Sequence, residues 1–316
     1  MRGSRVAVFG GSGFIGRYLV KRLAHAGANV TVAVRDPQGA QFLKPMGDVG
    51  QITPLYANVR KPKSVAQALQ GADMVVNLVG VLDQGSQPFA GVHVAGAKNI
   101  ATAAAELGIA RFVQVSAIGA SADSPALYAR TKAAGEKAVR EAVPTATILR
   151  PSVLFGPEDD FLNRFGAMSR IMPFLPLIGG GETRFQPVYV GDVADAIVAA
   201  LTMDAAQGQT YELGGPKIMT FKEVLEFILS VTKRPALLVP LPFPVAKAIG
   251  TVTQFLPSPP LTRDQVVMLE TDNVVGDGVP GFDALGIDKP ATIEAVAPAY
   301  LERFRKPSQQ DAADYG

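Results

Sequence analysis

Val6-Ala-Val-Phe9-Gly10-Gly-Ser-Gly-Phe-Ile-Gly16, close to the start of the chain, joins an apolar run to glycines spaced G-x-x-G-x-x-G. The apolar run has the length of a short buried strand. Apolar side chains then recur with helical spacing as far as Gly27, where we expect the helix to end. The glycines therefore lie in a turn between a strand and a helix, which predicts a βαβ unit at the start of an α/β domain.

The chemistry of this turn suits a dinucleotide. Without Cβ atoms at Gly10 and Gly13, the backbone can turn tightly and approach a pyrophosphate, whose charge meets free N–H groups and the positive helix end. Gly16 lets the helix lie close to the sheet. An ordinary turn is the alternative, but the strand-loop-helix context favours a nucleotide site. We expect the loop contacts to come from Gly10, Ser12, Gly13, Phe14, Ile15 and Gly16.

The first half of the chain alternates between apolar β-rich runs and helical patterns. Further strands are expected at Val30–Val34, Gln51–Tyr56, Met74–Val79, Phe112–Val115 and Thr147–Leu149. Helices are expected at Val65–Leu69, Val92–Leu107 and Ala129–Val143. Strands at this spacing with helices between them indicate a parallel sheet covered on both faces. The predicted fold is a Rossmann-type, doubly wound α/β domain.

Beyond about Pro151, proline and glycine become frequent and the alternation stops, except at Pro187–Leu201. That segment predicts a strand and then a helix capped by Asp192, returning to the main sheet. We therefore assign 1–157 and 186–204 to the nucleotide-binding domain and 158–185 and 205–306 to a smaller C-terminal α/β lobe. The polar stretch 307–316 is predicted to be a flexible tail.

The ends of the next strands supply more candidate cofactor contacts. An NAD-specific site places an acidic residue after the second strand, whereas this chain has Arg35, whose guanidinium suits the 2′-phosphate of NADP. Asp36 could instead take the ribose, and a solvated loop arginine is the plain alternative. Asn58 could bond the adenine amino group and Gly80 could admit the ribose, and ordinary loop roles remain open for both. Further candidates at these strand ends are Val59, Leu78 and Val79.

Tyr128-Ala-Arg-Thr-Lys132 is the second motif with chemistry. Residues four apart share a helix face, so the ammonium can lower the pKa of the phenol and bond the nicotinamide ribose. Such a tyrosine exchanges a proton with a carbonyl or alcohol. A surface helix pair is the alternative, but Ser116, at the end of a predicted strand, supports a site. We take Tyr128, Lys132 and, more weakly, Ser116 as catalytic candidates if the protein is active.

Composition excludes other kinds of chemistry. The 316 residues include no Cys and two His, and 30 Lys+Arg against 28 Asp+Glu leave a net charge of +2. Disulfides and thiolate chemistry are excluded, and no metal site is expected. The charge balance gives no footprint for nucleic acid. The first residues carry no targeting signal, so we expect the protein to stay in the compartment where it is made.

The chain is apolar for its class, with a mean hydropathy of +0.20, and the surplus gathers in 235–261. Lys247 is the sole charge there, and the prolines at 240, 242 and 244 forbid a membrane-spanning helix. A helix of about Val245–Phe255 remains, with Val245, Ala248, Ile249, Val252 and Phe255 on one side. It is either a core helix of the smaller lobe or a docking surface for a membrane-embedded partner or the lipid interface.

Several motifs carry a family resemblance. The glycine loop, Tyr128-x-x-x-Lys132 and Leu149-Arg-Pro-Ser-Val-Leu-Phe-Gly156 resemble the extended or atypical short-chain dehydrogenase/reductase superfamily. More narrowly, the chain is similar to the family of the 39 kDa NADPH-binding accessory subunit of respiratory complex I and its bacterial relatives. The segments that carry this likeness are Val115-Ser-Ala-Ile-Gly119, Lys132-Ala-Ala-Gly-Glu-Lys137, Phe155-Gly-Pro-Glu-Asp-Asp-Phe-Leu-Asn163, Gln186-Pro-Val-Tyr-Val-Gly-Asp-Val193 and Leu261-Thr-Arg-Asp-Gln265.

The resemblance implies a tightly held NADPH with a structural role. It adds Arg150, Pro151, Ser152 and Val153 to the expected cofactor contacts. It also implies complex I subunits near the quinone site as partners, and a peripheral place on the inner, cytoplasmic face of a bacterial inner membrane. Two departures from the superfamily stand out. Ala117 occupies the place of the hydroxyl that polarises a substrate carbonyl, and His93 replaces the usual Asn, more as a packed or cofactor-side residue than as a general base.

Two functions are consistent with these sequence features. The first is a non-catalytic accessory or assembly subunit of complex I that binds NADPH. The second is a free NAD(P)-dependent oxidoreductase or epimerase that acts on a sugar nucleotide or on a quinone or isoprenoid precursor. Ala117 and the segments 155–163 and 261–265 favour the subunit, whereas the intact pair of Tyr128 and Lys132 keeps the enzyme open.

Overall fold

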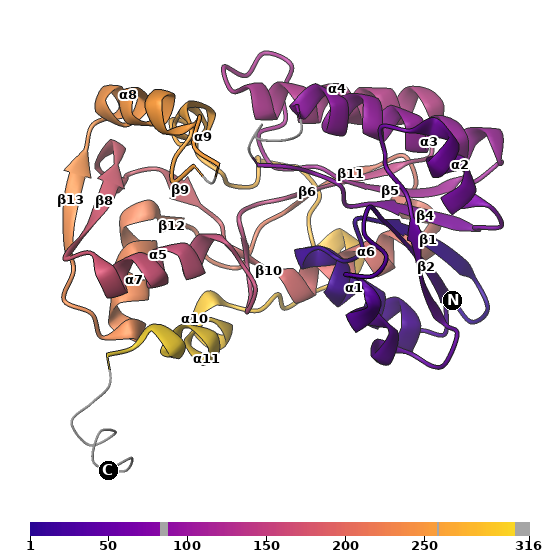
Figure 1. The fold of residues 1–316 in the computed structure, drawn as a ribbon, viewed down its shortest axis with the longest axis horizontal. Helices are drawn as coiled ribbons and strands as arrows, with labels where there is room; N and C mark the ends of the chain where they lie inside the picture. Colours follow the sequence, from indigo (N-terminus) through magenta and orange to yellow (C-terminus); the bar gives the residue numbers. More distant parts are fainter. Residues whose placement is uncertain (83–87, 258, 307–316) are drawn as a thin grey trace, which may run out of the picture.

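A seven-stranded parallel sheet forms the centre of the larger part of the molecule, in a computed structural model that describes residues 1–82, 88–257 and 259–306 (Figure 1). The strand order is β11-β6-β5-β4-β1-β2-β3, so the order reverses between β1 and β4. The strands are β1 (Arg5–Phe9), β2 (Asn29–Val34), β3 (Ile52–Tyr56), β4 (Met74–Asn77), β5 (Arg111–Val115), β6 (Thr147–Pro151) and β11 (Thr210–Leu213). The predicted doubly wound Rossmann fold is confirmed.

Helices cover both faces of this sheet, as the alternation in β1 requires. Val6 and Val8 face one apolar cluster together with α1 (Phe14–His25) and α6 (Val190–Thr202). Ala7 and Phe9 face the other, with α2 (Pro62–Leu69), α3 (Ala97–Glu106) and α4 (Leu127–Ala142). Figure 1 shows these two layers above and below the sheet. Because both faces are buried, the central strands β1 and β4 consist mostly of apolar residues.

The smaller lobe lies beyond the carboxyl end of the sheet (Figure 1). Its core is aromatic, and Phe161, Phe165, Phe185 and Phe221 pack ring against ring. Its main elements are α5 (Phe161–Ile171), β8 (Phe174–Ile178), β9 (Arg184–Phe185), β12 (Met219–Thr220), α7 (Phe221–Thr232), β13 (Leu237–Leu241), α8 (Phe243–Thr253), α9 (Arg263–Met268), α10 (Ile293–Val296) and α11 (Pro298–Leu301). Strands β8 and β13 pair in parallel, so the lobe is α/β as predicted.

Short elements complete the described chain. They are the π-helical turn η2 (Ala90–Gly96), which leads into α3, the 3-10 turns η1 (Gln41–Met46), η3 (Gly179–Gly181), η4 (Asp204–Ala206), η5 (Asp283–Leu285) and η6 (Glu302–Phe304), and the strands β7 (Leu154–Phe155) and β10 (Val188–Tyr189). The predicted tail, 307–316, lies outside the described residues.

The structure corrects the prediction for Pro187–Leu201. Its strand, β10, pairs with β7 in a separate two-stranded sheet, and α6 alone returns to the main domain, where it packs on α1. The helix begins after Tyr189, and Asp192 does not cap it, because its carboxylate accepts the N–H of Ala291 at 2.6 Å. The edge of the main sheet is instead β11, from a stretch that the sequence places in the smaller lobe.

The segment 155–163 ties the two parts together. Asp159 is buried, and its carboxylate accepts the N–H groups of Gly156 and Asn163 and the phenol of Tyr300 at 2.7 Å. Glu158 accepts the phenol of Tyr18 on α1 at 2.8 Å. The segment therefore joins α1, α5 and α11 by hydrogen bonds, a structural role that no nucleotide requires.

Helix α8 turns its apolar side outward. Val245, Ile249, Val252 and Phe255 are 47%, 41%, 74% and 82% exposed, and the helix buries the small residues Ala246 and Gly250. The prediction that these apolar residues share one side is confirmed, and that side is not part of the core. Within the described residues, none of the helices is both long and apolar enough to cross a membrane.

Candidate functional site: a nucleotide cradle beside a tyrosine–lysine helix

The glycine loop has the geometry that a dinucleotide needs. Gly10 has φ +79°, a conformation that favours glycine, and its carbonyl accepts the N–H of Gly13 at 3.0 Å. A Cβ on Gly16 would lie 2.4 Å from the carbonyl carbon of Gly11, so residue 16 must be glycine for α1 to approach the loop. By contrast, a Cβ on Gly13 would meet just the Gly10 carbonyl oxygen, at 3.2 Å. Gly13 is thus the open edge of the loop.

The first turn of α1 is free to receive an anion. Gly13 is its N-cap, no described side chain caps it, and its first turn contains no acidic residue. The loop also follows β1 at the point where the strand order reverses, which is where nucleotides bind in open α/β sheets. The uncapped N–H groups of α1 therefore fit a pyrophosphate. Ser12, Phe14 and Ile15 all lie at this helix start, as expected.

At the rim, the carboxylate of Asp36 accepts the N–H groups of Gln38 and Gly39, both at 3.1 Å, and so closes its own turn. Arg35 is exposed beside it. Asn58 uses its side-chain oxygen for the N–H of Arg60 at 3.0 Å, while its neighbour Val59 is buried. Asp36 is thus used to close its own turn, whereas Arg35 is exposed at the end of β2.

A buried polar pair shapes the end of β4. Asn77 donates to the side-chain oxygen of Gln114 on β5 at 2.8 Å and accepts the N–H of Val79 at 3.0 Å. This pair holds the turn formed by Leu78, Val79 and Gly80. A Cβ on Gly80 would lie 3.7 Å from Nζ of Lys132 and 3.8 Å from Nε2 of His93. The β4 turn and α4 therefore meet at one place, as expected of a shared site.

Lys132 and Tyr128 lie together on α4 in a desolvated setting. The ammonium of Lys132 donates to the carbonyl of Val115 at 3.0 Å, and burial lowers its pKa to about 8 although Glu136 opposes the shift. Burial raises the pKa of Tyr128 to about 12. The phenol therefore holds its proton at neutral pH, and a bound ligand would have to lower the pKa before Tyr128 could act as a base.

His93 is packed into this cluster. Its ring stacks on Phe89 with centroids 5.2 Å apart and meets Tyr128 edge-on at 5.4 Å. Nε2 accepts the N–H of Val81 at 3.1 Å, and burial lowers the pKa to about 3, with Lys132 adding to the effect. His93 is neutral at physiological pH, and the prediction of a packed residue is confirmed.

Ser116 gives the test of whether the residues fit a cofactor. Its side chain is buried, and its hydroxyl oxygen has no hydrogen-bond partner among the described residues. A buried hydroxyl without a partner is costly unless a ligand or water satisfies it. Ala117 follows it and offers no hydroxyl. The loop, the open helix end and this hydroxyl fit the diphosphate and nicotinamide half of a dinucleotide.

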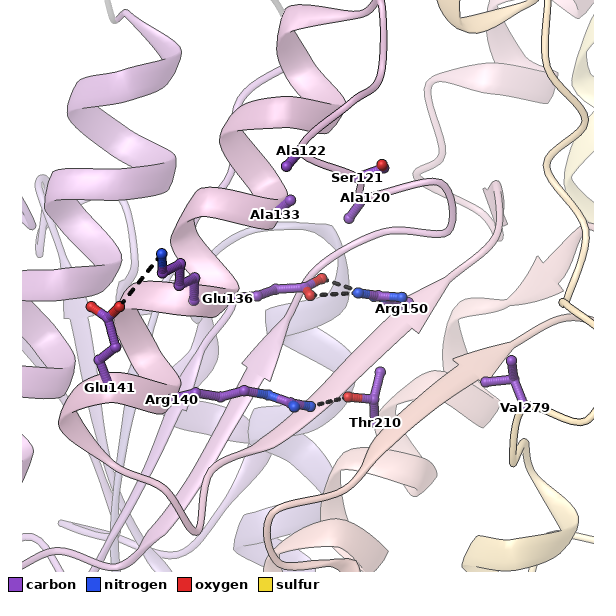
Figure 2. Close-up of a pocket in the computed structure, with 11 residues that line it drawn as sticks. Ala120, Ser121, Ala122, Ala133, Glu136, Arg140, Glu141, Arg150, Thr210 and Val279 are labelled. Carbon is purple, nitrogen blue, oxygen red and sulfur yellow. Dashed lines mark hydrogen bonds and ion pairs between the residues drawn. The ribbon is translucent and has the colours of Figure 1, made fainter.

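Two carboxylates hold the guanidinium of Arg150. Its guanidinium makes two hydrogen bonds to Glu136, at 2.9 and 2.7 Å, and a third contact with Glu212 at 3.4 Å. Arg150 and Glu136 line a cavity of about 710 Å³ between α4, β6 and β11. Figure 2 shows this pair, and beside it the hydrogen bond from Arg140 to Thr210. The glycine loop does not line that cavity. The guanidinium of Arg150 is therefore paired with the carboxylates of Glu136 and Glu212.

The residues after Arg150 hold the chain around the site. Ser152 donates to the side-chain oxygen of Asn273 at 2.7 Å, and the same oxygen accepts the N–H of Val153 at 3.0 Å. The carbonyl of Pro151 accepts the N–H of Ile118. These contacts place Pro151, Ser152 and Val153 in the framework that joins β6 to the smaller lobe.

Three residues of the site escape prediction from the sequence. Thr131 contacts His93, Glu136 pairs with Arg150, and Asp264 binds the start of α4 at two N–H groups. Each stands inside or beside a motif already noted, but its partner is distant in sequence. Among the described residues, no three His, Cys, Asp or Glu side chains gather as a metal site would require.

A doubly wound sheet, an open glycine loop and a Tyr–Lys helix define a Rossmann-type protein of the short-chain dehydrogenase/reductase class. The model of the NAD dependent epimerase/dehydratase family matches residues 6–214, and the chain belongs to that family. Its site is one for a nicotinamide dinucleotide. The fold matches the dTDP-glucose 4,6-dehydratase DesIV of Streptomyces venezuelae, with a TM-score of 0.73 at 20% identity over 95% of this chain and 96% of that one.

Closer relatives narrow the family. NADH dehydrogenase [ubiquinone] 1 alpha subcomplex subunit 9 of Arabidopsis thaliana is 41% identical over 312 residues, which cover 95% of this chain and 77% of that protein. At that identity and coverage the two are members of one protein family. Ceramide reductase of Caulobacter vibrioides is 33% identical over 196 residues, 61% of this chain and 60% of that enzyme.

Proposed function

We propose that this chain is an accessory or assembly subunit of a respiratory NADH:ubiquinone oxidoreductase, complex I. The observation that carries the proposal is its likeness to the Arabidopsis alpha subcomplex subunit 9 over 95% of its length. That likeness extends through the smaller lobe, where a general nucleotide-binding fold has no need of shared residues. It includes the stretches 155–163 and 261–265, which serve as structural joints here.

The bound nicotinamide nucleotide stabilises the subunit and is not turned over at a useful rate. The side chain of Ala117 cannot donate a hydrogen bond to a carbonyl, and loss of one such donor costs about 10²–10³ in rate by analogy with oxyanion holes. In contrast, the groups that would hold the nucleotide are all present. A ligand that binds just the folded state stabilises it by mass action, which explains why a site can persist without catalysis.

NADPH is the form of the cofactor that the rim favours. Arg35 is exposed at the end of β2, and Asp36 is used to close the adjacent turn. A guanidinium pairs well with the 2′-phosphate, whereas the carboxylate of Asp36 already accepts two backbone N–H groups of its own turn. We therefore assign Arg35 to the 2′-phosphate of NADPH.

The exposed side of α8 docks the subunit. Three large apolar side chains on one side of a short helix, with Phe255 just beyond its end, form an unusual exposed surface, and such patches mark protein or membrane contacts. We infer that this side faces the membrane-embedded part of complex I near its quinone site or the lipid beside it. The subunit then lies peripherally on the inner face of a bacterial inner membrane.

Copurification from solubilised membranes tests the proposal. We expect the chain to be recovered with other complex I subunits and to show no NADPH oxidation with a panel of carbonyl compounds. Recovery of the whole population as an active soluble monomer would contradict it.

A free oxidoreductase is the second candidate, and the intact pair of Tyr128 and Lys132 favours it. One relative, ceramide reductase, is named as an enzyme, although its similarity covers just 61% of this chain. Its substrate would be a sugar nucleotide or a quinone or isoprenoid precursor, with Tyr128 as the proton donor.

A further inference from the structure

Helix α4 carries Tyr128 and Lys132 but lacks an N-terminal cap of its own. Its N-cap is Ala126, which has no side-chain acceptor, and its first turn contains no acidic residue. The cap comes instead from Asp264, on α9 of the smaller lobe. The two oxygens of this carboxylate accept the N–H groups of Leu127 at 2.7 Å and Tyr128 at 2.9 Å. A negative charge at that end also favours the helix dipole.

Asp264 is held rigidly on its own helix. Thr262 and Gln265 form a reciprocal capping box at the start of α9, with hydrogen bonds of 3.2 and 3.1 Å. One turn later Val267 packs with Ala126 and Ala129 in a small apolar cluster between α9 and α4. The carboxylate is therefore aimed at α4 by contacts on both sides of it.

Helix α9 is in turn seated on α8. A Cβ on Gly250 would lie 2.8 Å from the backbone nitrogen of Arg263, so the two helices touch at the backbone. Thr253 donates to the carbonyl of Leu261 at 2.6 Å, and Lys247 pairs with Glu270 at 2.7 Å. A continuous path of contacts thus leads from the exposed apolar side of α8, through α9, to the backbone of Tyr128.

We propose that Asp264 is a positioning residue, which sets the start of α4 so that Tyr128 and Lys132 can hold the nicotinamide half of the nucleotide. The smaller lobe then completes the cofactor site, although none of its own side chains needs to touch the nucleotide. By linkage, whatever seats α8 and α9 more firmly strengthens cofactor binding, and the cofactor strengthens that seating. This inference rests on the proposed nicotinamide site, and it adds that contacts from the smaller lobe influence how tightly that site binds the nucleotide.

The test compares two ligands on the full chain. NADPH spans the whole site, whereas adenosine 2′,5′-bisphosphate lacks the nicotinamide ribose and reaches the glycine loop and the rim. In Asp264→Ala we expect the Kd for NADPH to rise about tenfold and the Kd for the bisphosphate to stay the same. Asp264→Asn keeps one acceptor oxygen, so its Kd for NADPH should fall between those of the parent and Asp264→Ala. Asp277→Ala, at an exposed carboxylate, is the matched control.

Bisphosphate binding also shows that each variant is folded, so a loss of NADPH affinity alone cannot come from global unfolding. Unchanged NADPH affinity in both Asp264 variants overturns the inference, and so does equal weakening of the two ligands, which would mean a merely structural residue. If the parent chain binds neither NADPH nor NADH, the proposed nicotinamide site is absent and this inference fails with it, whereas membership of complex I is tested separately by copurification.

Discussion

Nδ1 of His93 lies 3.0 Å from the hydroxyl oxygen of Thr131, one residue before Lys132 on α4. The threonine hydroxyl donates to the carbonyl of Tyr128, so it must accept from the ring, and the proton of the imidazole is on Nδ1. Nε2 then accepts from Val81, which matches the lone pair on that side. The neutral histidine therefore joins the turn after β4 to α4, the helix that carries Tyr128 and Lys132, by hydrogen bonds.

This arrangement predicts a pH dependence of stability. In the unfolded chain His93 gains a proton below about pH 6.5, whereas in the folded chain its pKa is about 3. The unfolded state therefore binds more protons between these values. The unfolding free energy should be highest above pH 6.5 and fall by up to about 1.4 kcal/mol per pH unit below it. His93→Gln should lack this part of the slope in urea unfolding at pH 7, 6, 5 and 4; parallel curves would show that the shift is absent.

Gly16→Ala should damage both the fold and the site. The new methyl group would overlap the Gly11 backbone, which cannot move without displacing β1 from α1. We expect a loss of about 1–3 kcal/mol of unfolding free energy and no measurable NADPH binding. Urea unfolding and fluorescence titration measure the two effects.

Gly13→Ala is the matched control for that change. Its φ of −77° suits alanine, and a methyl group there would contact just the Gly10 carbonyl oxygen while taking space in the loop that we expect the pyrophosphate to approach. Stability should therefore stay near that of the parent while NADPH binding weakens. If both glycine variants behave alike, the loop does not approach the ligand as described.

Arg35→Asp should separate the two nicotinamide nucleotides. Loss of a charged hydrogen bond to the 2′-phosphate predicts a rise of about 10- to 100-fold in the Kd for NADPH, with little change for NADH. Lys21→Asp, an equal charge change at an exposed position on α1, should alter neither. Equal ratios of the two affinities in the parent and Arg35→Asp would refute the assignment.

Tyr128→Phe distinguishes the two proposed functions. The ring packing against His93 and Phe89 survives the change, so we expect the unfolding free energy to move by less than about 1 kcal/mol and assembly with complex I subunits to remain intact. Any NADPH oxidation by the parent should disappear in the variant. Failure of assembly would show that the phenol itself is structural.

The exposed side of α8 predicts where membrane association can be broken. Val252→Asp combined with Phe255→Asp puts two charges on the docking side and should release the chain from membranes, while NADPH binding by the released protein persists. Thr251→Asp, at an exposed position on the same helix, should leave association unchanged. Retention of the double variant at the parent level would remove α8 from the interface.

Much of the main domain could be predicted from local pattern. Periodic apolar runs identify β1 and α1, and the glycine spacing identifies the turn between them, because each signal lies within a few residues of the chain. The edge strand β11 escaped prediction because Thr210–Leu213 is short and follows a long insertion. The partners of Arg150 escaped prediction for a related reason: a guanidinium pairs with whatever carboxylate folding brings near, and Glu136 and Glu212 lie on other elements.

By itself the sequence determined a Rossmann-type fold, a glycine loop between a strand and a helix that suits a nucleotide, and an apolar helix that could not span a membrane. Those properties follow from periodicity, backbone sterics and proline chemistry, which act locally. Tertiary structure alone decided that the apolar side of α8 faces outward, that His93 is neutral and bonds Val81 and Thr131, and that Asp264 caps the helix of Tyr128. Burial and long-range hydrogen bonds depend on which residues, distant in sequence, come together in the folded protein, and local sequence patterns do not carry that information.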